Sequence, residues 1–160
     1  MDPLLALQNA IGYSFNDRRL LERALVHASA DGVLEEDVLI AGRLSWLGDA
    51  TLHMIVSDKL FHAHSDATKE ELHKMREKLT DNTTLGRVGF KLGLEEAARI
   101  GASLSTNLAA SDKHVMIAGI LEAVLAAVYQ DGGIANARSV VLRILQKDVE
   151  HIPKSADETF

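Results

Sequence analysis

The sequence predicts an all-helical domain, and three observations carry this prediction. Only two prolines interrupt the 160 residues, and the apolar residues recur at a spacing near 3.6. With 47% apolar residues, the chain is long enough for one domain with a substantial hydrophobic core. We therefore expect about seven to eight helices within residues 1–152, followed by a polar, disordered tail at 153–160.

Composition excludes several classes of protein. The chain has no cysteine, so disulfides and thiolate metal sites are absent, and its net charge of -6 argues against a uniformly basic nucleic-acid binder. A local basic face remains compatible with that charge. No run of 18 uninterrupted apolar residues occurs, and the first three residues do not open a signal peptide. We expect a soluble, intracellular protein of the cytoplasm or an organelle interior, with no membrane partner.

The first two helices are predicted from their end signals. Pro3 suits the first position of a helix, and Gly12 can end that helix in the left-handed conformation. Asn16 or Asp17 can cap a second helix, whose apolar stripe begins at Leu20. The following segment, 30–40, contains a glycine and an acidic run and is interpreted as a loop.

Four further helices follow in order. A long helix is predicted from about 41 to 62, and a polar stretch that can supply a cap precedes another helix at 69–79. Asp81 or Asn82 can begin the next helix, which Gly93 ends. A short helix around 95–100 then leads into a loop of small residues at 101–111.

The last part of the chain holds the most apolar helix. Residues 115–129 contain a single charge, Glu122, and are apolar all round, so we expect this helix inside the bundle. The sequence Gln-Asp-Gly-Gly at 130–133 should end it sharply. A final amphipathic helix is predicted from 134 to about 152.

A second isolated carboxylate lies on the long helix at 41–62. Asp49 is the only formally charged residue between 44 and 56. A carboxylate away from water requires a cation, hydrogen bonds or a metal, and one interpretation is that Asp49 and Glu122 face one another and share Mg²⁺ or Mn²⁺. Two alternatives remain open: each carboxylate pairs with an arginine such as Arg43, or Asp49 is solvated at the rim of its helix.

Two segments resemble the ribonuclease III family. Residues 42–50 read Gly-Arg-Leu-Ser-Trp-Leu-Gly-Asp-Ala and resemble its signature Glu-Arg-Leu-Glu-Phe-Leu-Gly-Asp-Ala, and residues 118–123 resemble its Ala-Asp-x-x-Glu-Ala. The resemblance covers about residues 3–147. It implies the all-helical ribonuclease III fold and a two-fold dimer, in which an aromatic residue at the place of Trp46 packs at the subunit contact. A tryptophan of the core is the alternative.

The chain departs from this family at its metal ligands. The resemblance implies four carboxylates that hold magnesium for phosphodiester cleavage, and these positions here read Ser45, Asp49, Gly119 and Glu122. Glu71 is the remaining acid that could contact a metal-bound water, while His53 is a weaker candidate ligand. With half of the set replaced, we expect weak or absent binding of Mg²⁺ or Mn²⁺ and impaired cleavage.

RNA is the partner that the resemblance implies. The sequence shows no double-stranded-RNA-binding domain after the last predicted helix, so the candidate contacts are the basic residues Lys69, Lys74, Arg76 and Lys78, which could follow phosphates. A plain solvated face is the alternative. We expect a non-cleaving component of RNA processing or of a ribonucleoprotein complex, as a homodimer. The alternatives are an active short endoribonuclease and a non-catalytic partner of an active relative in a heterodimer.

Overall fold

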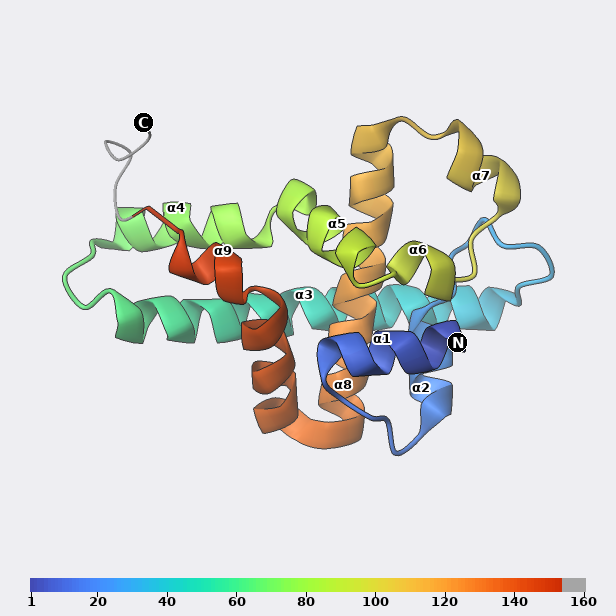
Figure 1. Ribbon diagram of the computed structural model, residues 1–160, viewed down its shortest axis with the longest axis horizontal. Helices are drawn as coiled ribbons and strands as arrows, with labels where there is room; N and C mark the ends of the chain where they lie inside the picture. The colour runs from blue at the N-terminus through green and yellow to red at the C-terminus, as the bar shows by residue number, and fades with distance from the viewer. Residues whose placement is uncertain (154–160) are drawn as a thin grey trace.

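The computed structural model describes residues 1–153, apart from the side chain of Ser105, and it is all-helical as predicted (Figure 1). The predicted tail at 153–160 lies, after Pro153, outside the described residues. One parallel bridge, between Val26 and Arg99, joins the end of α2 to the segment after α6. The helices are α1 (Pro3–Ile11), α2 (Arg18–Ala24), α3 (Glu35–Ala63), α4 (Lys69–Thr80), α5 (Asn82–Lys91), α6 (Leu94–Ala97), α7 (Ala102–Asn107), α8 (Ala110–Ile144) and α9 (Gln146–Glu150).

The predicted end signals act as expected. Gly12 ends α1 with φ 74°, and Gly93 adopts φ 81° between α5 and α6. The Asp17 side chain accepts a hydrogen bond from the Arg19 amide at the start of α2. Asp81 accepts from the Thr84 amide and caps α5. These signals act within one turn of chain, which is why the sequence alone reveals them.

Two predicted loops are partly helical. Helix α3 begins at Glu35 rather than near residue 41, so the acidic run that suggested a loop forms its first turn. Acidic side chains at that position interact favourably with the positive end of the helix dipole. The predicted loop at 101–111 contains α7 and the start of α8 at Ala110. The interpretation as irregular chain was therefore wrong for about half of 30–40 and for most of 101–111.

The glycine pair after residue 130 breaks α8 as predicted. Gly133 has φ 80° and ψ 176°, so the continuous span of α8 consists of two helical pieces joined at this residue. The second piece ends at Ile144 and α9 at Glu150, so the single final helix predicted to reach residue 152 is divided.

Asp131, just before the glycine pair, ties the bend at Gly133 to the segment between α1 and α2. Its carboxylate accepts hydrogen bonds from the Tyr13 hydroxyl at 2.7 Å and from the amides of Asn16 and Asp17 at 2.7 and 2.9 Å. Burial alone would raise the pKa of Asp131, but these hydrogen bonds outweigh it and lower that pKa.

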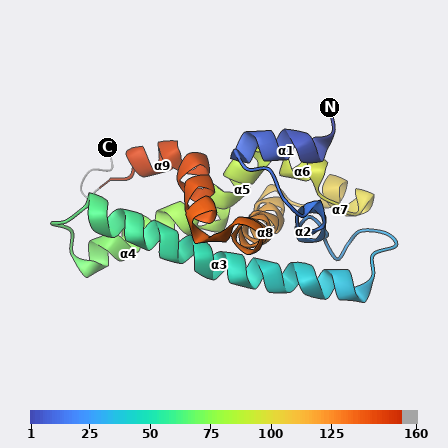
Figure 2. The same cartoon turned by 90° about the horizontal axis from the view of Figure 1, so that it is seen from below.

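The first piece of α8 is the centre of the domain. It runs transversely across α3, and α4 lies alongside the C-terminal half of α3 (Figure 1). Figure 2 shows α3 along one side of the molecule, with α1, α2 and α9 all on the same side of it. Among the described helices, α8 alone is long and apolar enough to cross a membrane, but 61% of its most apolar window is buried inside the protein. The apolar character of α8 is therefore explained by its position in the core of the domain.

Helices α3 and α8 meet backbone to backbone at Gly48. A Cβ atom built on Gly48 would lie 1.7 Å from the carbonyl oxygen of Glu122 and 2.4 Å from its carbonyl carbon. No side chain fits in that space, so glycine is required for the two helices to approach this closely. The crossing places Asp49, the next residue of α3, beside Glu122 of α8.

We predict that Gly48→Ala destabilises the domain by about 3 kcal/mol or more, because the added methyl group forces α3 and α8 apart. Urea unfolding followed by circular dichroism measures this loss. Gly42→Ala is the matched control, since it lies in the same helix and its new Cβ meets nothing within 4 Å. That control should stabilise the domain by about 0.5 to 1 kcal/mol through helix propensity. Equal stability of the Gly48→Ala and parent proteins would contradict the close crossing.

Candidate functional site

The two isolated carboxylates come together at the crossing of α3 and α8. The Asp49 side chain is exposed, whereas Glu122 is half-buried. Burial, and secondarily the negative charge of Asp49, raise the pKa of Glu122 to about 7. A half-buried carboxyl group beside a second carboxylate suits a cation, since a positive ion offsets both the repulsion and the desolvation cost of Glu122.

His53 orients Asp49 from one turn further along α3. Its Nδ1 atom lies 2.8 Å from the Asp49 carbonyl oxygen and 3.2 Å from Asp49 Oδ1. Both of these oxygens accept hydrogen bonds, so we assign the proton to Nδ1, which donates to them. The opposite ring atom, Nε2, lies 3.4 Å from the Thr80 hydroxyl oxygen on α4. Because the Thr80 hydroxyl donates its hydrogen to the Arg76 carbonyl oxygen, His53 is held through Nδ1, on the side of Asp49.

The structure distinguishes the alternatives for the two acids. Arg43 is exposed and makes no ion pair with either acid among the described residues, so arginine pairing is not what holds them. The exposed side chain of Asp49 agrees with a solvated helix rim. Within residues 1–153, no hydrogen bond or ion pair reaches the half-buried carboxylate of Glu122. It is the one acid at the crossing whose burial lacks a compensating partner.

The three positions where the family has further acids line one apolar hollow. Gly42, Ser45 and Gly119 border a cavity of about 300 Å³. Apart from His27, its remaining lining is apolar: Ala24, Val26, Ala28, Val38, Ala41, Val115, Met116, Ile120 and Ala123. A Cβ atom on Gly119 would lie 3.8 Å from Ser45 Oγ, which is an ordinary contact. Larger side chains are therefore sterically allowed here, and steric crowding does not explain the missing acids.

The described residues contain no group of three or more histidine, aspartate or glutamate side chains arranged to hold a metal ion. Glu71, the remaining acid considered above, accepts a hydrogen bond from the Thr68 amide at 2.8 Å and completes the capping box of α4. Glu71 therefore lies at the N-terminal end of α4. Thr80, the residue that contacts His53, lies at the C-terminal end of the same helix. Any metal at the crossing would depend on Asp49 and Glu122 for its charged ligands.

Trp46 lies on the surface of α3. Its side chain is 79% exposed, which excludes the alternative of a core tryptophan. Leu39, one heptad earlier, is 62% exposed on the same helix. Large apolar side chains repeated along one face of a helix are typical of a contact surface.

The basic residues predicted to contact RNA lie on different faces of α4. Lys69 and Arg76 line one pocket with residues of α3, whereas Lys78 borders a second hollow formed with α9. Lys74 is exposed and lines neither. The sequence analysis did not single out Ser57 and Phe61, which complete the first pocket from α3. Helical spacing in the sequence assigns Leu60 to the core and so places the next residue, Phe61, outside it. The position of Phe61 beside α4 is visible only in the structure.

The fold is the one that the family resemblance implies. It is an all-helical bundle whose two central helices cross at a glycine, with one carboxylate from each beside the crossing. A family model described as Ribonuclease-III-like matches residues 17–149. The chain belongs to this family.

Individual relatives agree with the assignment. The protein named Ribonuclease 3 of Alkalilimnicola ehrlichii is 33% identical over 155 residues, covering 97% of this chain and 65% of that protein. Ribonuclease 3 of Shewanella sediminis is 37% identical over 136 residues, covering 85% of this chain and 57% of that protein. The chain thus spans about three fifths of the length of the curated relatives it matches.

Solved structures agree as well. The nuclease domain of Campylobacter jejuni ribonuclease III superposes with a TM-score of 0.81 at 26% identity, covering 96% of this chain and all of that one. A second structure of that domain, whose title reports structural flexibility in a region involved in dimer formation, gives a TM-score of 0.79 at 26% identity and covers 91% of this chain and 97% of that one. The resemblance identified from the sequence is confirmed at the level of family and fold.

The raised pKa of Glu122 predicts a specific pH dependence of stability. The folded state holds this proton up to about pH 7, whereas the unfolded state releases it near the ordinary value of 4.5. Stability therefore falls as the pH rises from about 4.5 to 7, by roughly 1 to 2 kcal/mol after allowance for partial exposure. Glu122→Gln should remove this loss and be more stable than the parent protein at pH 8.

Urea unfolding at pH 5 and pH 8 measures the effect. Glu70→Gln on the exposed face of α4 is the control and should follow the parent protein at both values. His27, whose pKa is lowered by burial, changes stability in the opposite direction over this range, so the parent protein is compared with Glu122→Gln. Equal changes in the stability of these two proteins between pH 5 and 8 would exclude a Glu122 carboxyl group with this pKa.

Proposed function

We propose that this domain binds structured or double-stranded RNA and acts in RNA processing or ribonucleoprotein assembly without efficient cleavage. The observation that supports the proposal is the pair of carboxylates at the crossing, Asp49 and Glu122, where the family resemblance implies four. The domain keeps the fold of its relatives while Ser45 and Gly119 stand at the other two positions. The chain's intracellular setting, in the cytoplasm or an organelle, belongs to the same proposal.

Charge explains why two acids are a poor nuclease site. Magnesium bound at such a crossing would polarise a phosphodiester and activate water. Asp49 and Glu122 would be its charged ligands, and every other coordination position would need water or an RNA phosphate. The proton held by Glu122 up to about pH 7 competes with the ion at neutral pH. The chain's own residues therefore fit one weakly held Mg²⁺ or Mn²⁺.

A cleavage and binding assay tests the proposal. Purified protein is incubated with labelled double-stranded RNA in Mg²⁺ and in Mn²⁺, and complex formation is followed by fluorescence anisotropy. We expect binding without products. Metal-dependent cuts that are abolished by Asp49→Ala or Glu122→Ala would establish an active endoribonuclease instead. Cleavage that appears only when an active relative is added would favour a heterodimer in which that relative supplies the complete site.

Restoring the missing acids should restore metal affinity. The double variant Ser45→Glu with Gly119→Asp places two carboxylates where the structure has room for them. We expect Mn²⁺ to bind about tenfold more tightly or better, as measured by calorimetry. Because the hollow is apolar, the same variant should be less stable than the parent without metal and should recover stability when Mn²⁺ is added. The matched control is Ser45→Gln with Gly119→Asn, which fills the hollow without charge. A double variant that gains no more Mn²⁺ affinity than this control would show that the acids do not meet at the crossing.

We also propose that two copies associate through the exposed face of α3. Trp46 and Leu39 lie on this face, and the other helices leave it uncovered (Figure 2). Trp46→Arg should shift the protein from dimer to monomer in analytical ultracentrifugation, because a charged side chain replaces a large apolar one at the contact. Leu5→Arg, at an exposed apolar position of α1, is the control for a general effect of surface charge. A parent protein that is monomeric at micromolar concentration would contradict this part of the proposal.

A further inference from the structure

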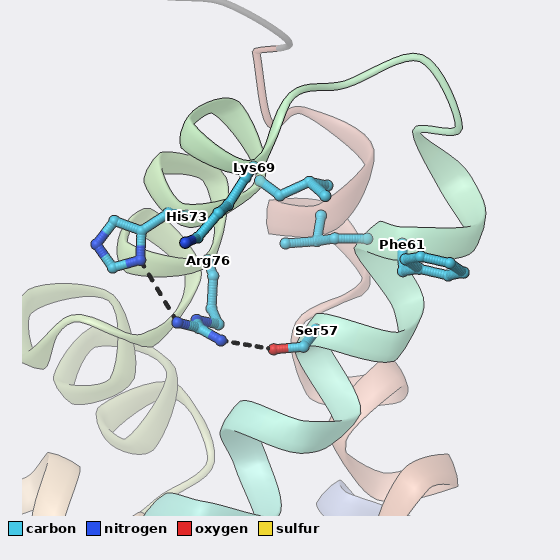
Figure 3. A pocket seen from close by; sticks show the side chains of 7 residues that line it. Ser57, Phe61, Lys69, His73 and Arg76 are labelled. Atoms are coloured by element: carbon cyan, nitrogen blue, oxygen red, sulfur yellow. Dashed lines mark hydrogen bonds between the residues drawn. The ribbon is translucent and has the colours of Figure 1, made fainter.

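A pocket separate from the crossing lies between the C-terminal part of α3 and the first half of α4. It has a volume of about 410 Å³ and is lined by Ser57, Leu60, Phe61, Lys69, Leu72, His73 and Arg76 (Figure 3). We call this the basic pocket. Its volume falls within the range of pockets that hold small ligands, about 300 to 1,000 Å³.

One side of the basic pocket is positively charged and held in place. Figure 3 shows the nitrogen atoms of Lys69, His73 and Arg76 gathered on the side of α4. Arg76 Nη1 donates to the Ser57 hydroxyl at 2.9 Å, and Nη2 lies 3.4 Å from His73 Nδ1. The ammonium group of Lys69 makes no ion pair or hydrogen bond within residues 1–153. A fixed guanidinium beside an unpaired ammonium is an arrangement that suits a phosphate group.

No acid lines this pocket, although the chain as a whole carries a net charge of -6. The acid nearest in contact is Glu77, whose Oε1 lies 3.4 Å from His73 Nε2, on the ring atom opposite the one that faces Arg76. The local excess of positive charge therefore runs against the overall balance of the protein and favours an anion.

The other side of the pocket is apolar and includes an exposed aromatic ring. Leu60 and Leu72 contribute apolar surface, and Phe61, at the outer edge of the pocket, is 66% exposed with its ring directed outward from α3 (Figure 3). Among the aromatic groups of the described residues the Phe61 ring contacts His62, with the ring planes nearly perpendicular and the centroids 5.2 Å apart, so at most one of its faces is occupied. A ligand that satisfies both sides must carry a flat apolar group and a negative charge. Nucleoside phosphates have both, and bases stack on aromatic side chains in many RNA complexes.

The basic pocket is connected to the crossing through α3 and α4. Thr80 donates to the Arg76 carbonyl oxygen at 2.8 Å and faces His53, which in turn contacts Asp49. Along α3, Ser57 lies eight residues after Asp49, which corresponds to a rise of about 12 Å. At about 3.4 Å per nucleotide, an RNA strand leaving the crossing would reach the pocket within roughly three or four nucleotides.

We propose that the basic pocket binds one unpaired nucleotide that flanks a paired RNA segment, with its phosphate at Lys69 and Arg76 and its base against Phe61. The domain would then distinguish RNA with an unpaired extension from a blunt duplex. This inference rests on the proposed RNA binding, and it adds a site that the crossing does not provide. A free nucleotide has the same chemistry and is the second source that the test must separate.

The test compares two labelled RNAs by fluorescence anisotropy: a blunt duplex and the same duplex with an unpaired 3′ extension of about four nucleotides, matched to the reach along α3. We expect the parent protein to bind the extended RNA roughly tenfold more tightly than the blunt duplex. This factor corresponds to the free energy of stacking one base on an aromatic side chain. Adenosine monophosphate is titrated separately by calorimetry to measure binding of the free nucleotide.

Variants test whether a preference for the extended RNA arises from the basic pocket. Phe61→Ala and Lys69→Ala should each remove most of the preference for the extended RNA. The preference is measured as the ratio of the two affinities, so a phosphate contact that Lys69 or Lys74 makes with both RNAs alike does not change the preference. Phe61→Tyr should keep it, because the flat ring remains. Lys74→Ala is the matched control, since it removes the same charge from the same helix outside the pocket. Circular dichroism melting confirms that each variant is folded, as expected for exposed positions.

Each outcome has a defined meaning. A preference that depends on Phe61 and Lys69 but not on Lys74 supports the inference. Equal binding of both RNAs by the parent protein overturns it while leaving the proposed RNA-binding function intact. Binding of adenosine monophosphate with no preference for the extension overturns the assignment to RNA and identifies a free-nucleotide site. If neither RNA binds, the proposed function fails first, and the inference fails with it.

Discussion

The close approach of two helix backbones at Gly48 is the constraint on which the rest of the structure depends. Because no Cβ fits between Gly48 and the Glu122 carbonyl group, the crossing of α3 and α8 is fixed by the main chain rather than by the acids beside it. The apolar residues of α8 then bury the interface. The fold therefore does not require acids at positions 45 and 119, where this chain has Ser45 and Gly119. A clear family fold is thus compatible with the smaller set of acids on which the proposed function rests.

The electrostatic interactions at the crossing also separate the stability of the fold from the binding of a metal ion. Four carboxylates packed into this space would repel one another strongly, and in an enzyme the bound cations offset that cost. Here two acids remain, one solvated and one half-buried, and burial and the nearby Asp49 raise the Glu122 pKa to about 7. The vacated positions line an apolar hollow instead of a polar one. Under the proposed function, two acids repel each other less than four would, so a bound cation has less repulsion to offset.

The features that depend on neighbouring residues in the sequence, such as helix caps, were predicted. The features that depend on contacts between distant segments were not. The caps at Gly12, Asp17 and Gly93 were predictable because each acts within one turn. The acidic run after residue 34 was interpreted as a loop because composition alone does not show that it sits at the positive end of a helix. For the site, a family signature identified the pair Asp49 and Glu122 and its missing partners. Ser57 and Phe61 carried no such signature, since their role arises only when α4 folds back along α3. The apolar hollow was equally hidden, because its lining comes from several separate segments of the chain.

Helix α3 links the separate surfaces of the domain into one rigid arrangement. Trp46, Asp49 and Ser57 lie on a single 29-residue helix, so its geometry fixes their separations along the axis and their directions around it. A partner at Trp46, RNA at the crossing and a nucleotide at the basic pocket would therefore be held at constant distances from one another. That property does not require bond cleavage. RNA bound as proposed would be positioned by the spacing along this helix, because the spacing is set by the backbone and not by the acids.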